Sequence, residues 1–199
     1  PLGGYSEPHE YIPALAHRIE QMGVEICSDH LVTSLVEQGG KIAGVNVRVA
    51  GDEIMIGADV VISTVHVWTL HLLSNLGIKI PAKAFVHQRY VTNPCPAPVN
   101  IPAINANPQG GYMRPARVGP SDYRLLAGFE SADRLEFKLP SADFRMTELS
   151  APTQYREEMT QNLTTVMPGM ETMTWESEKV GLISFAVDGE PVLGPIRQF

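Results

Sequence analysis

The chain has 199 residues, of which 44% are hydrophobic and 19% are charged, which is enough for one large domain or two small ones with a buried core. Its formal net charge is -7, and the acidic residues are scattered along the chain. Nucleic-acid binders normally carry a basic surplus on one face, so we expect neither nucleic acid nor an anionic membrane as a partner. No apolar stretch approaches the roughly 20 residues that span a bilayer.

The two cysteines, Cys27 and Cys95, are too few for a disulfide framework. They predict free thiols in a reducing compartment, and since no signal peptide is recognisable we expect a cytoplasmic protein. The chain begins at Pro1 without a methionine. We therefore expect it to be processed or excised from a longer protein.

The first part of the chain predicts a helix and a β-meander. Apolar residues recur at spacings of three and four between Ser6 and Gly23, which is the pattern of one helical face. The short β-branched segment 24–27 predicts a strand directly after this helix. Two β-rich runs, 31–36 and 41–49, are joined by a turn with two glycines, and a third run over 52–56 extends the hairpin into a meander.

Residues 58–64 are apolar on both faces, which is typical of a fully buried strand. The segment ends in Ser63 and Thr64, and ligand sites tend to lie at the carboxyl ends of parallel strands. A short helix over 68–76, closed by Gly77, is predicted next.

After Pro81 the pattern changes to short strands separated by proline-rich connections. The predicted elements are strands over 83–92, 111–114 and 124–130, a helix over 153–167, and strands over 172–177 and 180–185. Repeated short strands with turn signals indicate an antiparallel sheet. The fold class is therefore mixed α+β and α/β, with an antiparallel sheet as its second part.

Several common catalytic motifs are missing from the sequence. The six histidines form no H-E-x-x-H motif and no cluster with cysteine, so we predict no metal site. Neither a nucleophile elbow, G-x-S-x-G, nor a phosphate loop, G-x-x-x-x-G-K-[ST], occurs. The dinucleotide-binding fingerprint G-x-G-x-x-G is also absent.

A succession of weaker motifs covers nearly the whole chain. In chain order they are Gly3-Gly4-Tyr5, Gly23–Ile26, Val32–Leu35, Ala58–Thr64 with Trp68, His87–Thr92, Gly111–Pro115, Leu125–Glu130, Gly181–Phe185 and Asp188–Pro195. In order and spacing they resemble the middle of the FAD-dependent oxidoreductases of the D-amino-acid oxidase superfamily.

The resemblance implies a chain that passes between two domains. Residues 1–78 and 177–199 would belong to a partial, Rossmann-like FAD-binding domain, and residues 79–176 to an antiparallel-sheet substrate domain. The fingerprint that binds FAD would lie before Pro1 and a glycine-rich flavin segment after Phe199. The implied activity is oxidation of a C–N bond in a small amine or N-methyl amino acid, with FAD as the cofactor of the complete protein and not retained by this segment.

Matching positions imply particular site residues. Val32 and Thr33 would contact the adenine half of FAD, and Thr64 and Trp68 would lie near its ribityl chain. On the substrate side the resemblance implies Tyr112, Arg114 and Ile183, while catalytic residues remain unassigned. Core packing is an equally good interpretation of Trp68, because tryptophan is usually highly buried.

Two positions depart from the family pattern. Ile183 stands where many amino-acid oxidases have an arginine that grips the substrate carboxylate, so Arg114 or Arg117 is left to supply a cation, although either is equally explained as a solvated surface charge. The Gly181–Phe185 run followed by Asp188 resembles the dimethylglycine and sarcosine dehydrogenase branch. Val65-His66 replaces a small Ala-Gly pair at a turn that packs against the flavin, which makes His66 either a flavin neighbour or a mark of a site that has drifted.

These departures leave an alternative function open, namely a non-catalytic binding or scaffold module that keeps the fold without the flavin. An FAD-domain piece without its remaining parts should expose apolar surface. We therefore expect that missing parts of the parent chain, or self-association, cover such surface.

Overall fold

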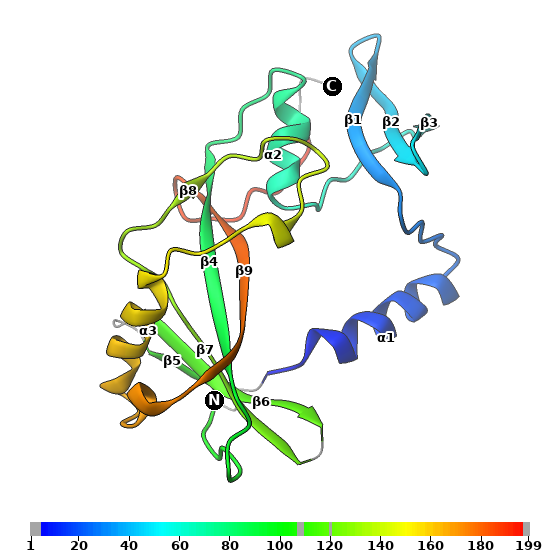
Figure 1. The fold of residues 1–199 in the computed structure, drawn as a ribbon. Coiled ribbons are helices and arrows are strands. Elements are labelled where there is room, and N and C mark those ends of the chain that lie inside the picture. Colours follow the sequence, from blue (N-terminus) through cyan, green and yellow to red (C-terminus); the bar gives the residue numbers. More distant parts are fainter. Residues whose placement is uncertain (1–4, 107–109, 120, 197–199) are drawn as a thin grey trace. The chain divides into compact units, whose positions relative to one another are not determined.

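The computed structural model describes residues 5–106, 110–119 and 121–196 (Figure 1). Gly3 and Gly4 of the N-terminal motif lie outside the described residues. The chain divides into two compact units. The first comprises Pro1–Pro8, Phe85–Leu135 and Met146–Ile183, and the second comprises His9–Ala84, Glu136–Arg145 and Ser184–Phe199. The domain limits predicted from the sequence, 1–78, 79–176 and 177–199, stay predictions.

An antiparallel sheet has the strand order β5-β6-β7-β4-β8, and β9 pairs with β4; most of this sheet belongs to the first unit, and β8 belongs to the second. The strands are β4 (Ala82–Thr92), β5 (Ile104–Ala106), β6 (Gly111–Gly119), β7 (Asp122–Phe129), β8 (Glu136–Phe137) and β9 (Trp175–Ala186). The predicted antiparallel sheet and the mixed α and β class are confirmed. The two runs predicted at 172–177 and 180–185 form the single strand β9, and the short strands β5 and β8 were not predicted.

Helix α3 (Gln154–Thr164) closes one face of this sheet. Its buried residues Tyr155, Met159 and Leu163 recur every four positions, which places them on one helical face. Figure 1 shows α3 beside β5 and β7. The core between helix and sheet consists of Tyr90, Met113, Leu125, Ala127, Phe129, Met159, Leu163 and Met170, all at most 8% exposed. The predicted helix is confirmed, although it ends three residues early and is followed by the 3-10 turn η2 (Met170–Thr172).

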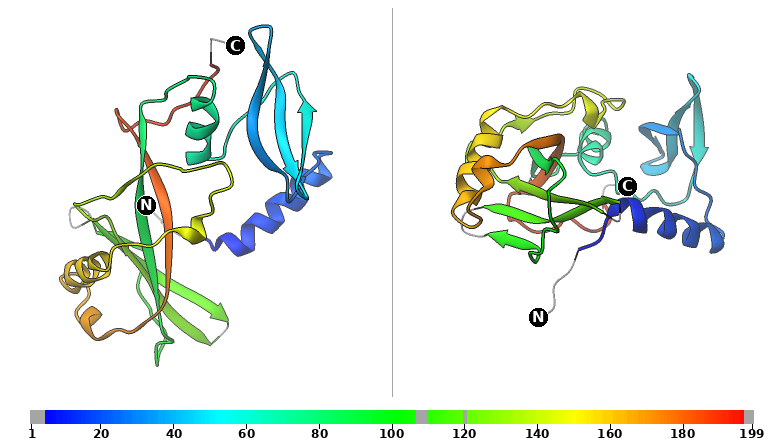
Figure 2. Two further views of the ribbon diagram at one scale, coloured as in Figure 1. Left: turned by 45° about the horizontal axis from the view of Figure 1, so that its top comes forward. Right: turned by 60° about the horizontal axis from the view of Figure 1, so that its bottom comes forward.

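The second unit contains the predicted meander, formed by β1 (Leu31–Gln38), β2 (Lys41–Val49) and β3 (Asp52–Gly57) in antiparallel order (Figure 2). Gly39 and Gly40 form its first turn with φ of 61° and 78°, where glycine avoids the strain a side chain would cause. Helix α2 (Val67–Ser74) confirms the helix predicted at 68–76. Phe137 and Phe144 pack together in the same unit, next to the 3-10 turn η1 (Met146–Glu148) in sequence.

Helix α1 (Pro8–Gln21) confirms the first predicted helix, but its apolar face is not covered. None of its residues is buried, and Ile12 and Leu15 are 53% and 54% exposed. An amphipathic helix normally buries this stripe. The described part of the chain therefore provides no cover for the apolar side of α1.

Two predicted strands are wrong. Residues 24–27 and 58–64 form no strand, and Val60 and Ile62, expected to be buried, are 74% and 82% exposed. A β-strand exists only by pairing with a neighbour, and within the described ranges neither segment has one. The apolar composition of 58–64 is thus real, but nothing in the described chain buries it.

No helix among the described residues is both long and apolar enough to cross a membrane.

The contact between α3 and the sheet leads to a stability prediction. A Cβ added to Gly111 on β6 would lie 2.4 Å from Cδ2 of Leu163, which is fully buried. We expect Gly111→Ala to lower the free energy of unfolding by about 1–3 kcal/mol, as overpacking of a core does. Gly181→Ala on β9 is the matched control, because no atom lies within 4 Å of its added Cβ. Urea unfolding of both variants measures this, and equal stabilities would contradict the packing described.

Candidate functional site

The face of the sheet opposite α3 carries a row of polar and charged side chains. On β4, Tyr90 belongs to the core beneath α3, and side chains alternate along a strand, so His87 and Arg89 point to the other face. The register pairs Arg89 with Gly128 on β7, and Gly128 with Tyr112 on β6. Directly paired residues share a face, so β4 and β6 direct their polar side chains to the same side of β7.

Because Gly128 has no side chain, side chains of β4 and β6 come into contact across β7. A Cβ on Gly128 would lie 2.3 Å from Cζ and Oη of Tyr112, so the phenol ring occupies the space above the glycine. From there the Tyr112 hydroxyl reaches Nε2 of His87 at 3.2 Å, and the two rings stack with centroids 6.0 Å apart. Tyr112 and His87 therefore form a hydrogen-bonded pair across β7.

Burial sets the protonation states of this pair. Burial lowers the pKa of His87, while Glu130 raises it and Arg134 lowers it further. Burial also raises the pKa of Tyr112, and the charge of Arg89 partly opposes this. Both rings are thus neutral near pH 7, and one hydrogen bond joins a phenol to an uncharged imidazole.

Arg114, predicted to bind substrate, lies on the same strand as Tyr112 but is already held by an ion pair. Its guanidinium donates two hydrogen bonds to the Glu7 carboxylate, of 2.5 and 3.1 Å, and lies 4.6 Å from the centre of the Tyr5 ring. The side chain is only 14% exposed. Residues 5–7 thereby attach to the sheet through Arg114, and its role toward substrate stays a prediction.

Ile183 lies half-buried on β9, the strand that pairs with β4. Its aliphatic side chain offers no group that binds a carboxylate, so its role toward substrate also stays a prediction. Of the three predicted substrate-side residues, the structure brings Tyr112 and Arg114 to one strand and one face.

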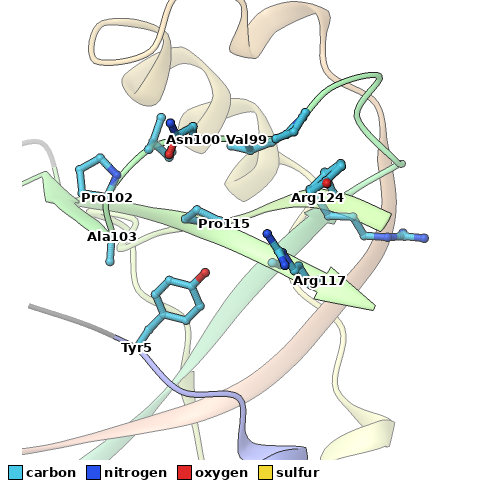
Figure 3. A pocket seen from close by; sticks show the side chains of 12 residues that line it. Tyr5, Val99, Asn100, Pro102, Ala103, Pro115, Arg117 and Arg124 are labelled. Atoms are coloured by element: carbon cyan, nitrogen blue, oxygen red, sulfur yellow. The ribbon is translucent and has the colours of Figure 1, made fainter. Parts of the chain in front are cut away.

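A hollow of about 960 Å³ lies at the end of the β6–β7 hairpin (Figure 3). Tyr5, the loop 98–103 and Arg117 line it, and Figure 3 shows the Arg124 guanidinium directed away from it. Arg124 is bound by the Asp122 carboxylate at 2.8 and 2.9 Å and by Glu176. This network ties β7 to β9, so we assign Arg124 a structural role.

In the second unit, Val32 and Thr33 lie at an irregularity in β1. The register with β2 shifts between Val32 and Ser34, as in a β-bulge. The Thr33 hydroxyl donates to the backbone carbonyl of Asn46 and to the Glu53 carboxylate, both at 3.3 Å. The predicted adenine contacts thus lie where β1 departs from regular pairing, and their role stays a prediction.

Thr64 and Trp68 flank the turn that leads into α2. Thr64 is exposed and Trp68 is half-buried in the first turn of the helix. Between them, His66 has φ 52° and ψ -123°, a conformation that favours glycine. Partial burial lowers the pKa of its imidazole. The backbone of this turn has the shape that a glycine would give it, although the residue is a histidine.

Sequence reasoning did not single out His87 and Arg89, although both lie in the segment His87–Thr92 of the family resemblance. Strand alternation alone would place them opposite Tyr90. What the sequence does not reveal is that Gly128 pairs with both Arg89 and Tyr112, because this depends on register between strands distant in sequence. Among the described residues, no group of three or more His, Cys, Asp or Glu side chains is arranged to hold a metal ion.

Comparison with known proteins gives a match over the full chain. The family model "FAD dependent oxidoreductase" (DAO) matches residues 1–199. Among solved structures, L-proline dehydrogenase from P. horikoshii is similar with a TM-score of 0.76 and 19% identity, over 97% of this chain and 48% of that chain. Iminodiacetate oxidase from Chelativorans sp. BNC1 is similar with a TM-score of 0.66 and 20% identity, over 94% and 46%.

Glycine oxidase from Geobacillus kaustophilus is similar with a TM-score of 0.61 and 16% identity, over 92% of this chain and 43% of that chain. At these identities the likeness shows the fold. The chain spans about half the length of these solved structures.

The close contact between Tyr112 and Gly128 can be tested by filling the space. Gly128→Ala should displace the phenol ring and break its hydrogen bond to His87, because the added Cβ and the ring cannot occupy the same volume. The NMR signals of the His87 ring should then shift. Gly119→Ala at the end of β6, with no atom within 4 Å, is the control that should leave these signals unchanged. Unchanged His87 signals in Gly128→Ala would disprove the contact.

The lowered pKa of His87 predicts a pH dependence of stability. A folded pKa below the ordinary value of 6.5 means that the unfolded chain binds the proton more tightly. The contribution of His87 to stability is therefore fully present above pH 6.5 and is lost as the pH falls through the folded pKa. Urea unfolding between pH 7.5 and about 5 should show a smaller loss in His87→Gln. His9→Gln on α1 is the control, and an equal loss in all three proteins would contradict the prediction.

Proposed function

This chain belongs to the family of FAD-dependent oxidoreductases, and we propose that it is the central and substrate-binding portion of an enzyme that oxidises a C–N bond in an amine or N-methyl amino acid. The observation that carries the proposal is the neutral His87–Tyr112 pair on the sheet face opposite α3. The match to the family over residues 1–199 supports it. The similar solved structures are, by name, a proline dehydrogenase, an iminodiacetate oxidase and a glycine oxidase.

The His87–Tyr112 pair is suited to receive a proton from an amine. Oxidation at the carbon next to nitrogen needs an unprotonated amine, whose lone pair assists the departure of the hydride. In the tautomer of His87 with unprotonated Nε2, the Tyr112 hydroxyl donates to this nitrogen, and the phenol oxygen keeps a lone pair that accepts an N–H of the substrate. When the substrate releases a proton to the Tyr112 oxygen, the hydroxyl proton of Tyr112 moves to Nε2 of His87. The imidazole then acts as the general base, a role that suits histidine at neutral pH.

We propose that the complete enzyme uses FAD, which would supply the acceptor for the hydride, that is, for one proton and two electrons. The residues of the second unit fit such a group in one respect, because the turn at His66 keeps a glycine-like backbone that permits close approach. Thr64 and Trp68 beside this turn, and Val32 and Thr33 at the β1 irregularity, are the residues that we propose hold it. His66 then becomes a neighbour of the cofactor.

Uncovered apolar surface supports the proposal that this segment alone does not retain FAD. The exposed stripe of α1 and the exposed residues Val60 and Ile62 lack cover in the described part of the chain. All residues of β3 are exposed as well. We propose that further parts of the parent protein, or a second copy of the chain, cover these surfaces. A reducing, cytoplasmic location is proposed from the free thiols of Cys27 and Cys95.

The proposal is tested by comparing residues 1–199 with the reading frame extended on both sides. The short chain should show no flavin absorbance and no turnover of sarcosine or dimethylglycine, whereas the extended protein should show both. In the extended protein, Tyr112→Phe and His87→Gln should lower kcat by about 10²- to 10⁴-fold while the flavin content stays the same. Tyr11→Phe on α1 is the control.

Two outcomes would count against the proposal in different ways. Flavin binding and turnover by residues 1–199 alone would contradict the incompleteness of this segment. An extended protein that folds without flavin would favour the non-catalytic binding or scaffold module.

A further inference from the structure

We propose that Glu130 is a positioning residue for His87, and that its carboxylate stabilises the imidazolium that forms when this histidine takes the proton from Tyr112. Arg134 forms an ion pair with Glu130 and sets how strongly the carboxylate acts. The inference rests on the proposed function, since it concerns the proton that the substrate amine releases. It adds a carboxylate to the pair on the sheet face opposite α3.

The register of the sheet places Glu130 opposite His87. Arg89 on β4 pairs with Gly128 on β7 in antiparallel order. Continuing this register by two residues brings His87 opposite position 130, directly after the end of β7. Side chains two positions apart along a strand point to the same face. Glu130 therefore follows Gly128 on the face that carries His87.

Hydrogen bonds hold the peptide group between Phe129 and Glu130 from both sides. Its N–H donates to the carbonyl of Gly110 at 3.1 Å, which continues the pairing of β7 with β6. Its carbonyl accepts from Nε2 of the buried Gln88 side chain on β4 at 3.2 Å. The backbone at position 130 thus stays between β4 and β6, although it lies beyond the last residue of β7.

The Glu130 carboxylate acts on both members of the pair. Burial lowers the pKa of His87 and Glu130 raises it, and Glu130 also raises the pKa of Tyr112. A negative charge favours the imidazolium and disfavours the phenolate. The proton transfer ends with a charged His87 and a neutral Tyr112, which is the state that the carboxylate favours. Arg89 and Arg114 are the other charges that act on Tyr112, and both lower its pKa.

Arg134 limits the effect of the carboxylate. Its guanidinium donates to Glu130 at 2.7 Å, and the two side chains are 38% and 41% exposed. The charge of Arg134 lowers the pKa of His87, in the direction opposite to that of Glu130. His87 is therefore neutral and able to accept a proton near pH 7, while a carboxylate lies close enough to stabilise it once it is charged.

The first test needs no cofactor and uses the two partners of one ion pair. In residues 1–199, Glu130→Gln should lower the pKa of His87 and Arg134→Gln should raise it. NMR titration measures this pKa, and the signals missing in His87→Gln assign the ring. Both side chains are partly exposed and lie outside the core, so both variants should fold.

The opposite signs distinguish this role from that of a structural ion pair. Both substitutions break the same pair, so a structural role alone would move the pKa of His87 in one direction in both variants. Glu130→Asp keeps the charge and should hold this pKa above its value in Glu130→Gln. Glu136→Gln removes a carboxylate that pairs with Lys83 and is the matched control, which should leave the pKa nearly unchanged. Shifts of the same sign, or no shift in Glu130→Gln, would overturn the proposal.

The second test measures the pH dependence of the reaction. In the extended protein with FAD, the acid limb of kcat/KM for dimethylglycine should move to lower pH in Glu130→Gln and to higher pH in Arg134→Gln, because His87 must be unprotonated to accept the proton. At pH 8, kcat of Glu130→Gln should fall by about 3- to 10-fold, since the imidazolium loses a partly screened charge interaction. A lower kcat without a shift of the acid limb would overturn the proposal.

Together the two tests separate this inference from the proposed function. If the extended protein oxidises no amine while the NMR shifts of the two variants keep opposite signs, the proposed function fails and the control of His87 by Glu130 stands. If the extended protein oxidises dimethylglycine and the acid limb is the same in Glu130→Gln and Arg134→Gln, the inference fails and the proposed function stands.

Discussion

The absence of a side chain at Gly128 is the constraint on which the candidate site depends. In a regular antiparallel sheet each strand separates the side chains of its two neighbours, and groups two strands apart rarely touch. Here the Tyr112 ring occupies the space that a side chain on β7 would fill, and this brings its hydroxyl to His87 on β4. The opposite face of the same strands is the core beneath α3, so the backbone below the site is held firmly. A polar pair is thus assembled by residues of three neighbouring strands.

Ion pairs decide which charges remain available on this face. Arg114 and Arg134 are each matched by a nearby carboxylate, which fixes their guanidinium groups and reduces their attraction for an added anion. The match at Arg114 also gives residues 5–7 a fixed attachment to the sheet. Because the pairing partner of Arg114 lies 107 positions earlier, the ion pair that occupies this arginine is a property of the fold. Such ion pairs explain why free guanidinium groups are scarce on this face, although the chain contains several arginines.

Most helices and strands were predictable because their signals are local. The spacing of apolar residues in α1 and the two glycines between β1 and β2 define these elements without knowledge of the rest of the chain. The failures at 24–27 and 58–64 have the opposite cause, because a strand requires a partner that local composition cannot supply. For the site, resemblance to a family pointed to Tyr112, whereas His87 and Arg89 required the register between β4, β7 and β6. The place of a strand in a sheet depends on the strands with which it pairs. The sequence of one strand does not identify a partner that is distant in the chain.

The two units differ in how much of their own apolar surface they bury. In the first, the apolar faces of β4, β6 and β7 and of α3 meet in one buried cluster. In the second, apolar residues of α1, of β3 and of segment 58–64 remain exposed. Burial of apolar surface is the main favourable term in folding, at about 25 cal/mol per Å², so the second unit gains less from its own residues than the first. If further chain covers these surfaces, its binding adds stability mainly to the unit that carries the proposed FAD contacts. Assembly of the proposed cofactor site and completion of that unit's core would then be one event, while the sheet face with the proposed substrate-side residues is already formed in the first unit.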